Sequence, residues 1–148
     1  FFHVFYLPFN KYYMQDAYTS AFYGVVKDTQ KQTGYELPHY LEAYIVLLLA
    51  SYVDKPYFEP KDSFAEAFLN LTNAKELGDT CLFVSGVFPS YGNRKGLSRK
   101  YYKDIGQSSY ASMHGEIFIS LATHFDFLSD FIEVTVHSSK HVQSILYR

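Results

Sequence analysis

Hydrophobic side chains recur at intervals of three and four residues along most of the chain, which is the spacing of one face of an α-helix. The first such stretch runs from about Gln15 to Thr29, and Gly34 follows as a plausible stop signal. A second stretch follows Pro38, a residue suited to a first helical turn, and its apolar positions continue to Val53. Because the other face of this second helix is also apolar, we expect it to be the central helix of the fold.

The next segment, from Lys55 to Pro60, carries two prolines and predicts a loop. Ser63 and Glu66 then stand at the spacing of a capping box, ahead of an apolar run. A short helix is therefore expected to start there.

Small side chains mark one face of the helix predicted after residue 73. This face carries Ala74, Gly78, Cys81 and Ser85. Small residues let another helix approach closely, and Gly106 supplies a similar position in the next predicted helix. We expect Gly78 and Gly106 to face each other.

The remaining chain predicts two long helices. Ser98 is suited to cap the first, whose helical period continues to Leu121. The second runs from Phe125 to about Leu146, although the β-branched run EVTV also allows a strand there. Five or six helices with uneven connections predict an all-α orthogonal bundle in a single domain, residues 1–148. Residues 1–13 are interpreted as a truncated or loosely attached segment.

Composition changes this picture mainly through its aromatic residues. Fifteen Tyr and fourteen Phe make 20% of the chain aromatic, whereas only 19% is charged. This is more aromatic side chains than one small core needs, which favours a surface that binds a partner. Thirteen basic residues against fifteen acidic ones leave no surplus for phosphate contacts, which argues against nucleic acid as a partner.

The basic residues cluster in one place only, which contains Arg94, Lys95, Arg99, Lys100 and Lys103. The loop sequence SYGNRKG within this region lacks the ending of a phosphate-binding loop and predicts a turn between helices.

The cysteine content and the length of apolar runs bear on location. A lone Cys81 within an apolar run predicts a core residue and favours a reducing, cytoplasmic compartment. The longest apolar run, Tyr44 to Ala50, is far shorter than the roughly 20 residues of a membrane span.

A family resemblance rests on three short sequence motifs: LGD, FVSGVF and YYKDIGQSSY. In this order they resemble a family of uncharacterised bacterial all-helical proteins, over roughly Gly24 to Phe131. The resemblance implies a helical fold. It implies no activity, substrate, cofactor or catalytic residue.

One candidate metal site lies near the C-terminal end. Glu133, His137 and His141 are four residues apart, so one helix would project all three from the same side. A carboxylate and two imidazoles suit a divalent ion such as zinc. Ligand pairs at four-residue spacing are, however, common by chance in a chain with six histidines, and no HExxH sequence is present. The more ordinary interpretation is a solvated helix face.

A second candidate is a polar cluster at a helix crossing, made of Asp79, Tyr101, Tyr102 and Asp104. Asp79 could act there as a general base, or it could accept tyrosine hydrogen bonds and fix the register of the helices. Because no nucleophile accompanies it, the structural role is favoured.

Other polar residues point to no reaction. Ser85 lacks the glycine pattern of a nucleophile elbow and predicts packing. His114, Glu116, His124 and Asp126 pair histidines with carboxylates but have no identified nucleophile.

These observations favour a non-enzymatic helical module. It would self-associate, or bind a protein or a small apolar ligand, through its aromatic surface, and no cofactor is implied. The alternative is a small metal-dependent or hydrolytic enzyme.

Overall fold

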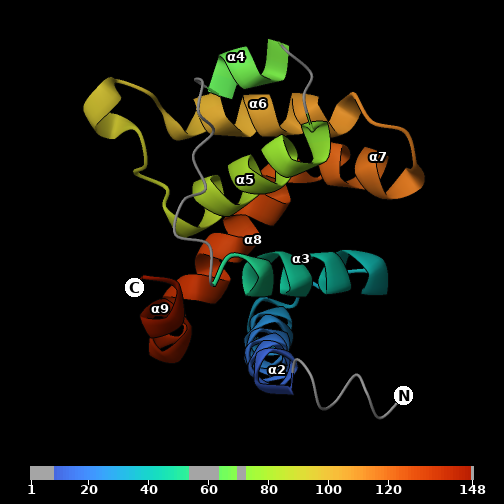
Figure 1. Cartoon of the computed structure of the whole chain (residues 1–148), viewed down its shortest axis with the longest axis vertical. Coiled ribbons are helices and arrows are strands. Elements are labelled where there is room, and N and C mark those ends of the chain that lie inside the picture. The colour runs from blue at the N-terminus through green and yellow to red at the C-terminus, as the bar shows by residue number, and fades with distance from the viewer. Residues whose placement is uncertain (1–8, 54–63, 70–72, 148) are drawn as a thin grey trace.

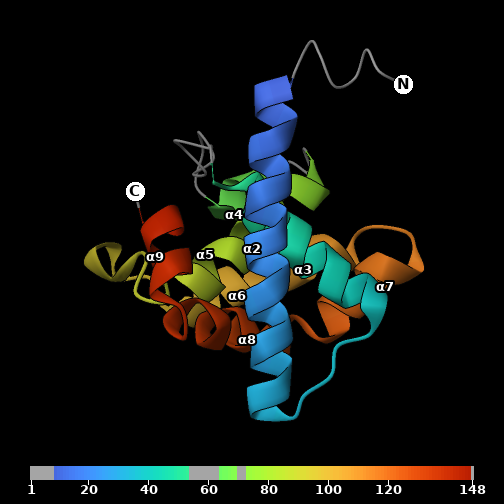
Figure 2. The ribbon, with the colours of Figure 1, turned by 90° about the horizontal axis from the view of Figure 1, so that it is seen from below.

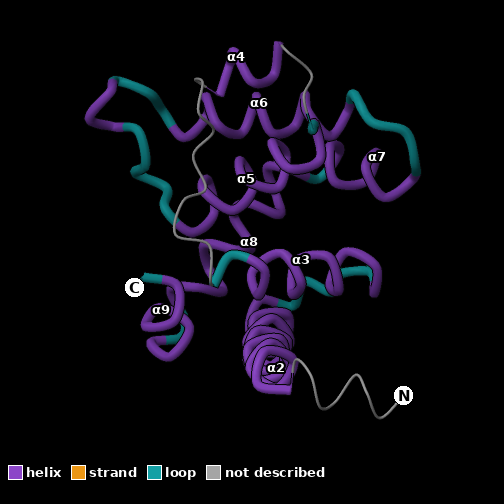
Figure 3. Tube along the Cα trace, viewed as in Figure 1, coloured by secondary structure: helices purple, strands orange, loops and turns teal. Residues whose placement is uncertain are grey.

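The computed structural model describes residues 9–53, 64–69 and 73–147. These residues form helices joined by short connections, and the described ranges contain no strand (Figure 3). The helices are α2 (Phe9–Thr33), α3 (His39–Ser51), α4 (Phe64–Leu69), α5 (Ala74–Val87), α6 (Arg99–Ala111), α7 (Glu116–Thr123), α8 (Phe125–His137) and α9 (Lys140–Leu146), with a short 3₁₀ helix at Asn93–Lys95. The all-α prediction is confirmed.

The described residues contain more helices than the five or six predicted, because both long helices near the C-terminal end are divided. The first breaks between α6 and α7, where Gly115 has a φ of 116° and a ψ of 146°. Side chains other than glycine rarely adopt that backbone conformation. Because α6 and α7 both bury apolar residues, the helical spacing of apolar positions in the sequence runs on across the break.

The second break separates α8 from α9. The Ser139 side chain accepts a hydrogen bond from the Val142 N–H at 3.2 Å and caps α9. Gln143 Nε2 donates to the carbonyl oxygen of Val136 at 3.0 Å, near the end of α8. The EVTV run lies within α8, so the strand alternative is wrong.

The centre of the fold is α5, not α3 as expected. Every residue from Leu77 to Val87 is buried, whereas Leu47 on α3 is 59% exposed. In Figure 1, α5 lies between α6 on one side and α3 and α8 on the other. The outer face of α3 carries apolar side chains that the described residues do not cover.

The small residues of α5 do allow a close approach, but the expected pairing of glycines is wrong. A Cβ on Gly106 would meet the Phe125 ring and would lie 2.7 Å from Cys81 Cβ. A Cβ on Gly78 would lie 2.6 Å from the Tyr110 ring. Each glycine therefore makes room for a larger side chain.

The long helix α2 crosses the rest of the molecule, and Figure 2 shows it running along one side. It begins at Phe9, inside the segment expected to be loosely attached, and stops as predicted at Gly34, whose φ is 76°. Lys55–Pro60 and the capping residue Ser63 lie outside the described residues, although α4 forms where the short helix was expected.

A buried carboxylate joins α2 to α3. Glu42 accepts hydrogen bonds from Gln30 Nε2 at 2.6 Å and from Lys27 Nζ at 2.9 Å. Gln30 Oε1 in turn accepts from the Leu37 N–H at 2.7 Å. Burial by itself would raise the pKa of Glu42, but the hydrogen bonds from Gln30 and Lys27 outweigh it and hold the pKa below its usual value.

No helix among the described residues has both the length and the hydropathy that crossing a membrane requires.

Candidate functional site

A hollow with aromatic walls lies between the end of α2 and the outer side of α8. Its volume is about 370 Å³. We call it the aromatic hollow, and its lining residues are Thr33, Tyr35, Asp126, Phe127, Asp130, Phe131 and Val134. A volume of this size lies within the usual range of small-molecule sites, roughly 300–1,000 Å³.

Three rings form the wall. The Tyr35 and Phe127 rings meet edge to face, with centroids 5.4 Å apart and planes at 88°. Phe127 and Phe131 are stacked with centroids 6.2 Å apart. Phe131 is buried, whereas Tyr35 is 62% exposed, so the rings run from the core out to solvent.

The periodicity of α8 explains why apolar and acidic groups meet here. Residues four apart lie on one side of a helix, so Phe127 and Phe131 form one row and Asp126 and Asp130 the adjacent row. A third row, which includes Leu128 and Ile132, is buried in the core. The helix thus holds the acidic row at the surface, while the aromatic row runs from half-buried Phe127 to buried Phe131.

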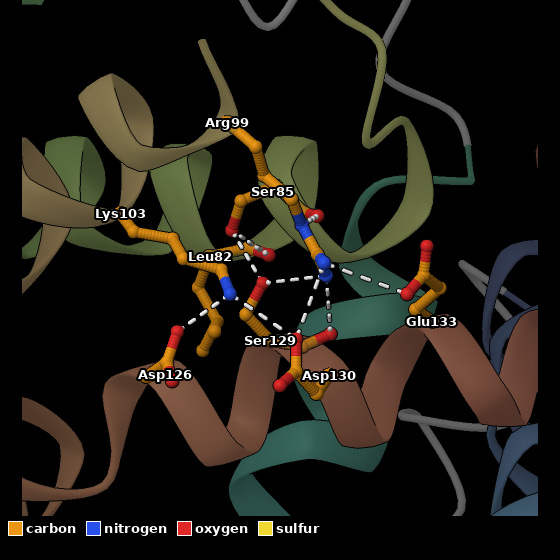
Figure 4. A network of polar contacts seen from close by, with 8 residues as sticks. All are labelled: Leu82, Ser85, Arg99, Lys103, Asp126, Ser129, Asp130 and Glu133. Carbon is orange, nitrogen blue, oxygen red and sulfur yellow. Dashed lines mark hydrogen bonds and ion pairs between the residues drawn. The ribbon is translucent and has the colours of Figure 1, made fainter.

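The acidic row is held by cations from α6, in what we call the ion-pair network (Figure 4). Lys103 Nζ lies 2.6 Å from Asp126 Oδ1 and 3.1 Å from Asp130 Oδ1. One nitrogen of Arg99 lies 3.2 Å from Asp130 Oδ1 and 3.5 Å from Glu133 Oε1. The hydrogen bond and charge of Lys103 hold the pKa of Asp126 below its usual value.

Arg99 also binds the network to α5. Its Nε donates to the carbonyl oxygen of Ser85 at 2.8 Å, and another nitrogen donates to Ser129 Oγ at 3.3 Å. The hydroxyls of Ser85 and Ser129 are 2.8 Å apart and buried. One guanidinium therefore connects three helices, and the predicted packing role of Ser85 agrees with its buried, hydrogen-bonded hydroxyl.

The polar cluster around Asp79 exists, but with other tyrosines than those predicted. Asp79 Oδ1 accepts hydrogen bonds from the hydroxyls of Tyr44 at 2.6 Å and Tyr110 at 2.5 Å. Lys75 Nζ lies 2.8 Å from Asp79 Oδ2. Burial, together with the neighbouring Asp79, raises the pKa of both phenols, so each remains a hydrogen-bond donor at neutral pH.

The predicted partners of Asp79 lie elsewhere. Tyr102 is buried with its ring edge to face against Phe64, at a centroid distance of 5.0 Å, and Tyr101 packs beside it. Asp104 is exposed and pairs with Lys100 at 2.6 Å. The first turns of α6 thus face α4 and solvent, while Tyr110 near its end reaches Asp79.

The geometry assumed for the metal candidate is wrong. Glu133 and His137 lie on α8, but His141 lies on α9, beyond the break at Ser138 and Ser139. Glu133 faces Arg99 instead. Across the described ranges, no group of three His, Cys, Asp or Glu side chains is placed to hold a metal ion.

The other candidate residues are also dispersed. His114 precedes α7, Glu116 begins it, and His124 separates α7 from α8, while Asp126 pairs with Lys103. The loop SYGNRKG forms the predicted turn, with Gly92 and Gly96 both at positive φ.

The basic cluster is largely neutralised. Arg99, Lys100 and Lys103 all pair with carboxylates. Together with Asp104, Gln107, Phe125 and Asp126 they line a separate hollow of about 390 Å³, but an anion there would have to compete with those carboxylates. This arrangement argues further against a phosphate site.

Sequence reasoning assigned Phe127 and Phe131 to a helix without finding the hollow, and it did not single out Tyr35. The available signal is the paired spacing in FDFLSDF, where two acidic and two aromatic residues repeat at four-residue intervals. The contribution of Tyr35 carries no such signal, because it comes from a distant part of the chain.

Comparison of the chain with protein-family models, with curated proteins and with solved structures finds no match. The resemblance to a bacterial helical family therefore stays a prediction.

Proposed function

We propose that this chain is a non-enzymatic binding module whose aromatic hollow takes a small ligand with an apolar body. The observation that carries the proposal is the hollow itself, where three rings from two separate segments line a volume of about 370 Å³. Aromatic side chains supply much contact area for little loss of conformational freedom, which suits a binding wall. The ion-pair network holds the adjacent acidic row in place.

The state of the nucleophile candidates supports a role without catalysis. Cys81 is buried and burial raises the pKa of its thiol, while the hydroxyl of Ser85 is bonded to Ser129. The alternative, a small metal-dependent or hydrolytic enzyme, would need ligands or a base that the positions of His137, His141 and Asp79 do not provide together. A single buried cysteine remains compatible with the proposed cytoplasmic location.

The proposal is tested with a neutral apolar probe, phenylbutanol, followed by saturation-transfer NMR. Tyr35→Ala removes one wall of the hollow and is expected to weaken binding about fivefold or more. Tyr40→Ala is the matched control, because Tyr40 is 52% exposed on α3 and does not line the hollow. Equal effects of the two substitutions, or no binding to the unaltered chain, would contradict the proposal.

Native mass spectrometry beside a denaturing spectrum tests the enzyme alternative in the same preparation. A retained metal ion that is lost on denaturation would favour the alternative. His137→Ala with His141→Ala then shows whether those two side chains hold the metal.

A second copy of the chain is the second proposed partner, and the outer face of α3 is the observation that favours it. Tyr40 and Leu47 lie two helical turns apart on that face and both are exposed. The Tyr40 hydroxyl lies 3.2 Å from Ser120 Oγ on α7, next to exposed Ile119. Contiguous exposed apolar side chains are typical of a protein interface.

A further inference from the structure

The rim of the aromatic hollow carries more negative than positive charge. The two cations Arg99 and Lys103 face three carboxylates, those of Asp126, Asp130 and Glu133, so one negative charge is left over. The side chains of Asp126 and Asp130 are 80% and 55% exposed, and both line the hollow. A ligand in the hollow therefore lies beside carboxylates that water still reaches.

These two carboxylates retain capacity to accept hydrogen bonds. The ion pairs with Lys103 and Arg99 are formed through the Oδ1 atoms of Asp126 and Asp130. Within the described ranges, no hydrogen bond involves the Oδ2 atom of either aspartate. An ammonium group, which has donors and no acceptor, matches this rim.

The aromatic wall favours the same charge. The face of an aromatic ring carries a partial negative charge and attracts cations within about 6 Å of its centroid. Tyr35 and Phe127 meet at 88°, so they present surfaces in two different directions around the hollow. A positively charged group would therefore be attracted both by the rings and by the carboxylates.

We infer that the aromatic hollow binds a small organic cation, an amine with an aromatic or aliphatic body. This inference rests on the proposed function and adds the chemical class of the ligand. The apolar body packs against Phe127, Phe131 and Val134, and the ammonium group lies at the rim beside Asp126 and Asp130. An anionic ligand of the same shape would meet the same carboxylates and be repelled.

Three probes that differ in charge and share a body test the inference: phenylbutylamine, phenylbutanol and phenylbutyrate. Dissociation constants are measured by NMR titration of the whole chain at low salt and neutral pH. The amine is expected to bind about tenfold more tightly than the alcohol, and the carboxylate more weakly than either. Because exposed charges are screened, about 0.5 M salt should reduce the advantage of the amine while leaving the alcohol unchanged.

Substitutions then locate the charge preference. Asp126→Asn with Asp130→Asn should remove the advantage of the amine, so that the amine and the alcohol bind this variant equally well. Asp126→Asn alone should remove part of it and leaves the ion pairs of Asp130 in place, so it serves if the double variant unfolds. Asp28→Asn, an exposed aspartate on α2 outside the hollow, is the control.

The outcomes separate this inference from the proposed function. Equal binding of the amine and the alcohol overturns the inference and leaves a hollow that binds neutral apolar ligands. An amine advantage that survives the loss of both carboxylates also overturns it. Failure of all three probes to bind contradicts the proposed function itself.

Discussion

The hydroxyl of Tyr110 is the buried group whose loss we expect to cost most at the scale of a single side chain. It donates to Asp79 from a fully buried ring, and the pKa of Tyr110 is raised well above its ordinary value by burial and by that carboxylate. Tyr110→Phe removes one of the donors to a charged acceptor, so the free energy of unfolding should fall by about 1.5–3 kcal/mol. Chemical denaturation followed by circular dichroism measures this loss.

Tyr40→Phe supplies the control, since the Tyr40 hydroxyl bonds Ser120 at an exposed position. That substitution should change the free energy of unfolding by less than about 0.5 kcal/mol. Similar losses in the two variants would contradict a structural role for the Asp79 cluster.

The sequence predicts local signals, such as helix caps and stops, better than it predicts contacts between distant residues. Gly34 and Ser98 act within one turn of the chain, and both the predicted stop and the predicted cap are confirmed. Asp79 was singled out as the centre of a polar cluster, but Tyr44 and Tyr110 are far from it in sequence. The positions of the tyrosines in the sequence do not show which phenol reaches the carboxylate. The choice depends on how α3 and α6 cross α5.

The junction of α2 and α3 illustrates how one buried carboxylate joins two elements. Glu42 receives donors from Gln30 and Lys27, and these hydrogen bonds hold its pKa below the ordinary value of 4.5 despite its burial. A lowered pKa in the folded state contributes stability above the unfolded value, and this contribution is lost as the pH falls through the folded value. Glu42→Gln should therefore reduce the free energy of unfolding at neutral pH by about 1–2 kcal/mol.

The difference between the unaltered chain and Glu42→Gln should shrink when denaturation is repeated in acid, because protonation of the carboxylate removes its contribution. Glu36→Gln alters an exposed glutamate in the same connection and should leave stability unchanged at both pH values. A loss that is equally large in acid would show that the charge of Glu42 is not the cause.

Helix breaks are the elements that periodicity could not reveal. The four residues from Ser112 to Gly115 contain no proline, and the apolar spacing continues past them. α6 ends at Ala111, the positive φ of Gly115 comes directly before α7, and a serine cap begins α9. Both signals are single residues within a longer helical pattern, so the pattern predicted one helix where the fold has two.

At the scale of the whole molecule, the outer face of α3 leads us to expect a symmetric dimer. Leu47 is 59% exposed on α3, and nothing among the described residues covers it. Two copies that bury this face against each other would remove apolar surface from water on both sides, as a twofold interface does. Sedimentation velocity over increasing protein concentration should show the dimer, and Leu47→Glu should raise the dissociation constant of the dimer by at least about tenfold.

Val134→Glu places the same charge at an exposed apolar position on α8 and should leave the dimer intact. A monomer at every concentration would exclude this interface, and a dimer equally sensitive to both substitutions would place the contact on a wider surface that includes the aromatic hollow.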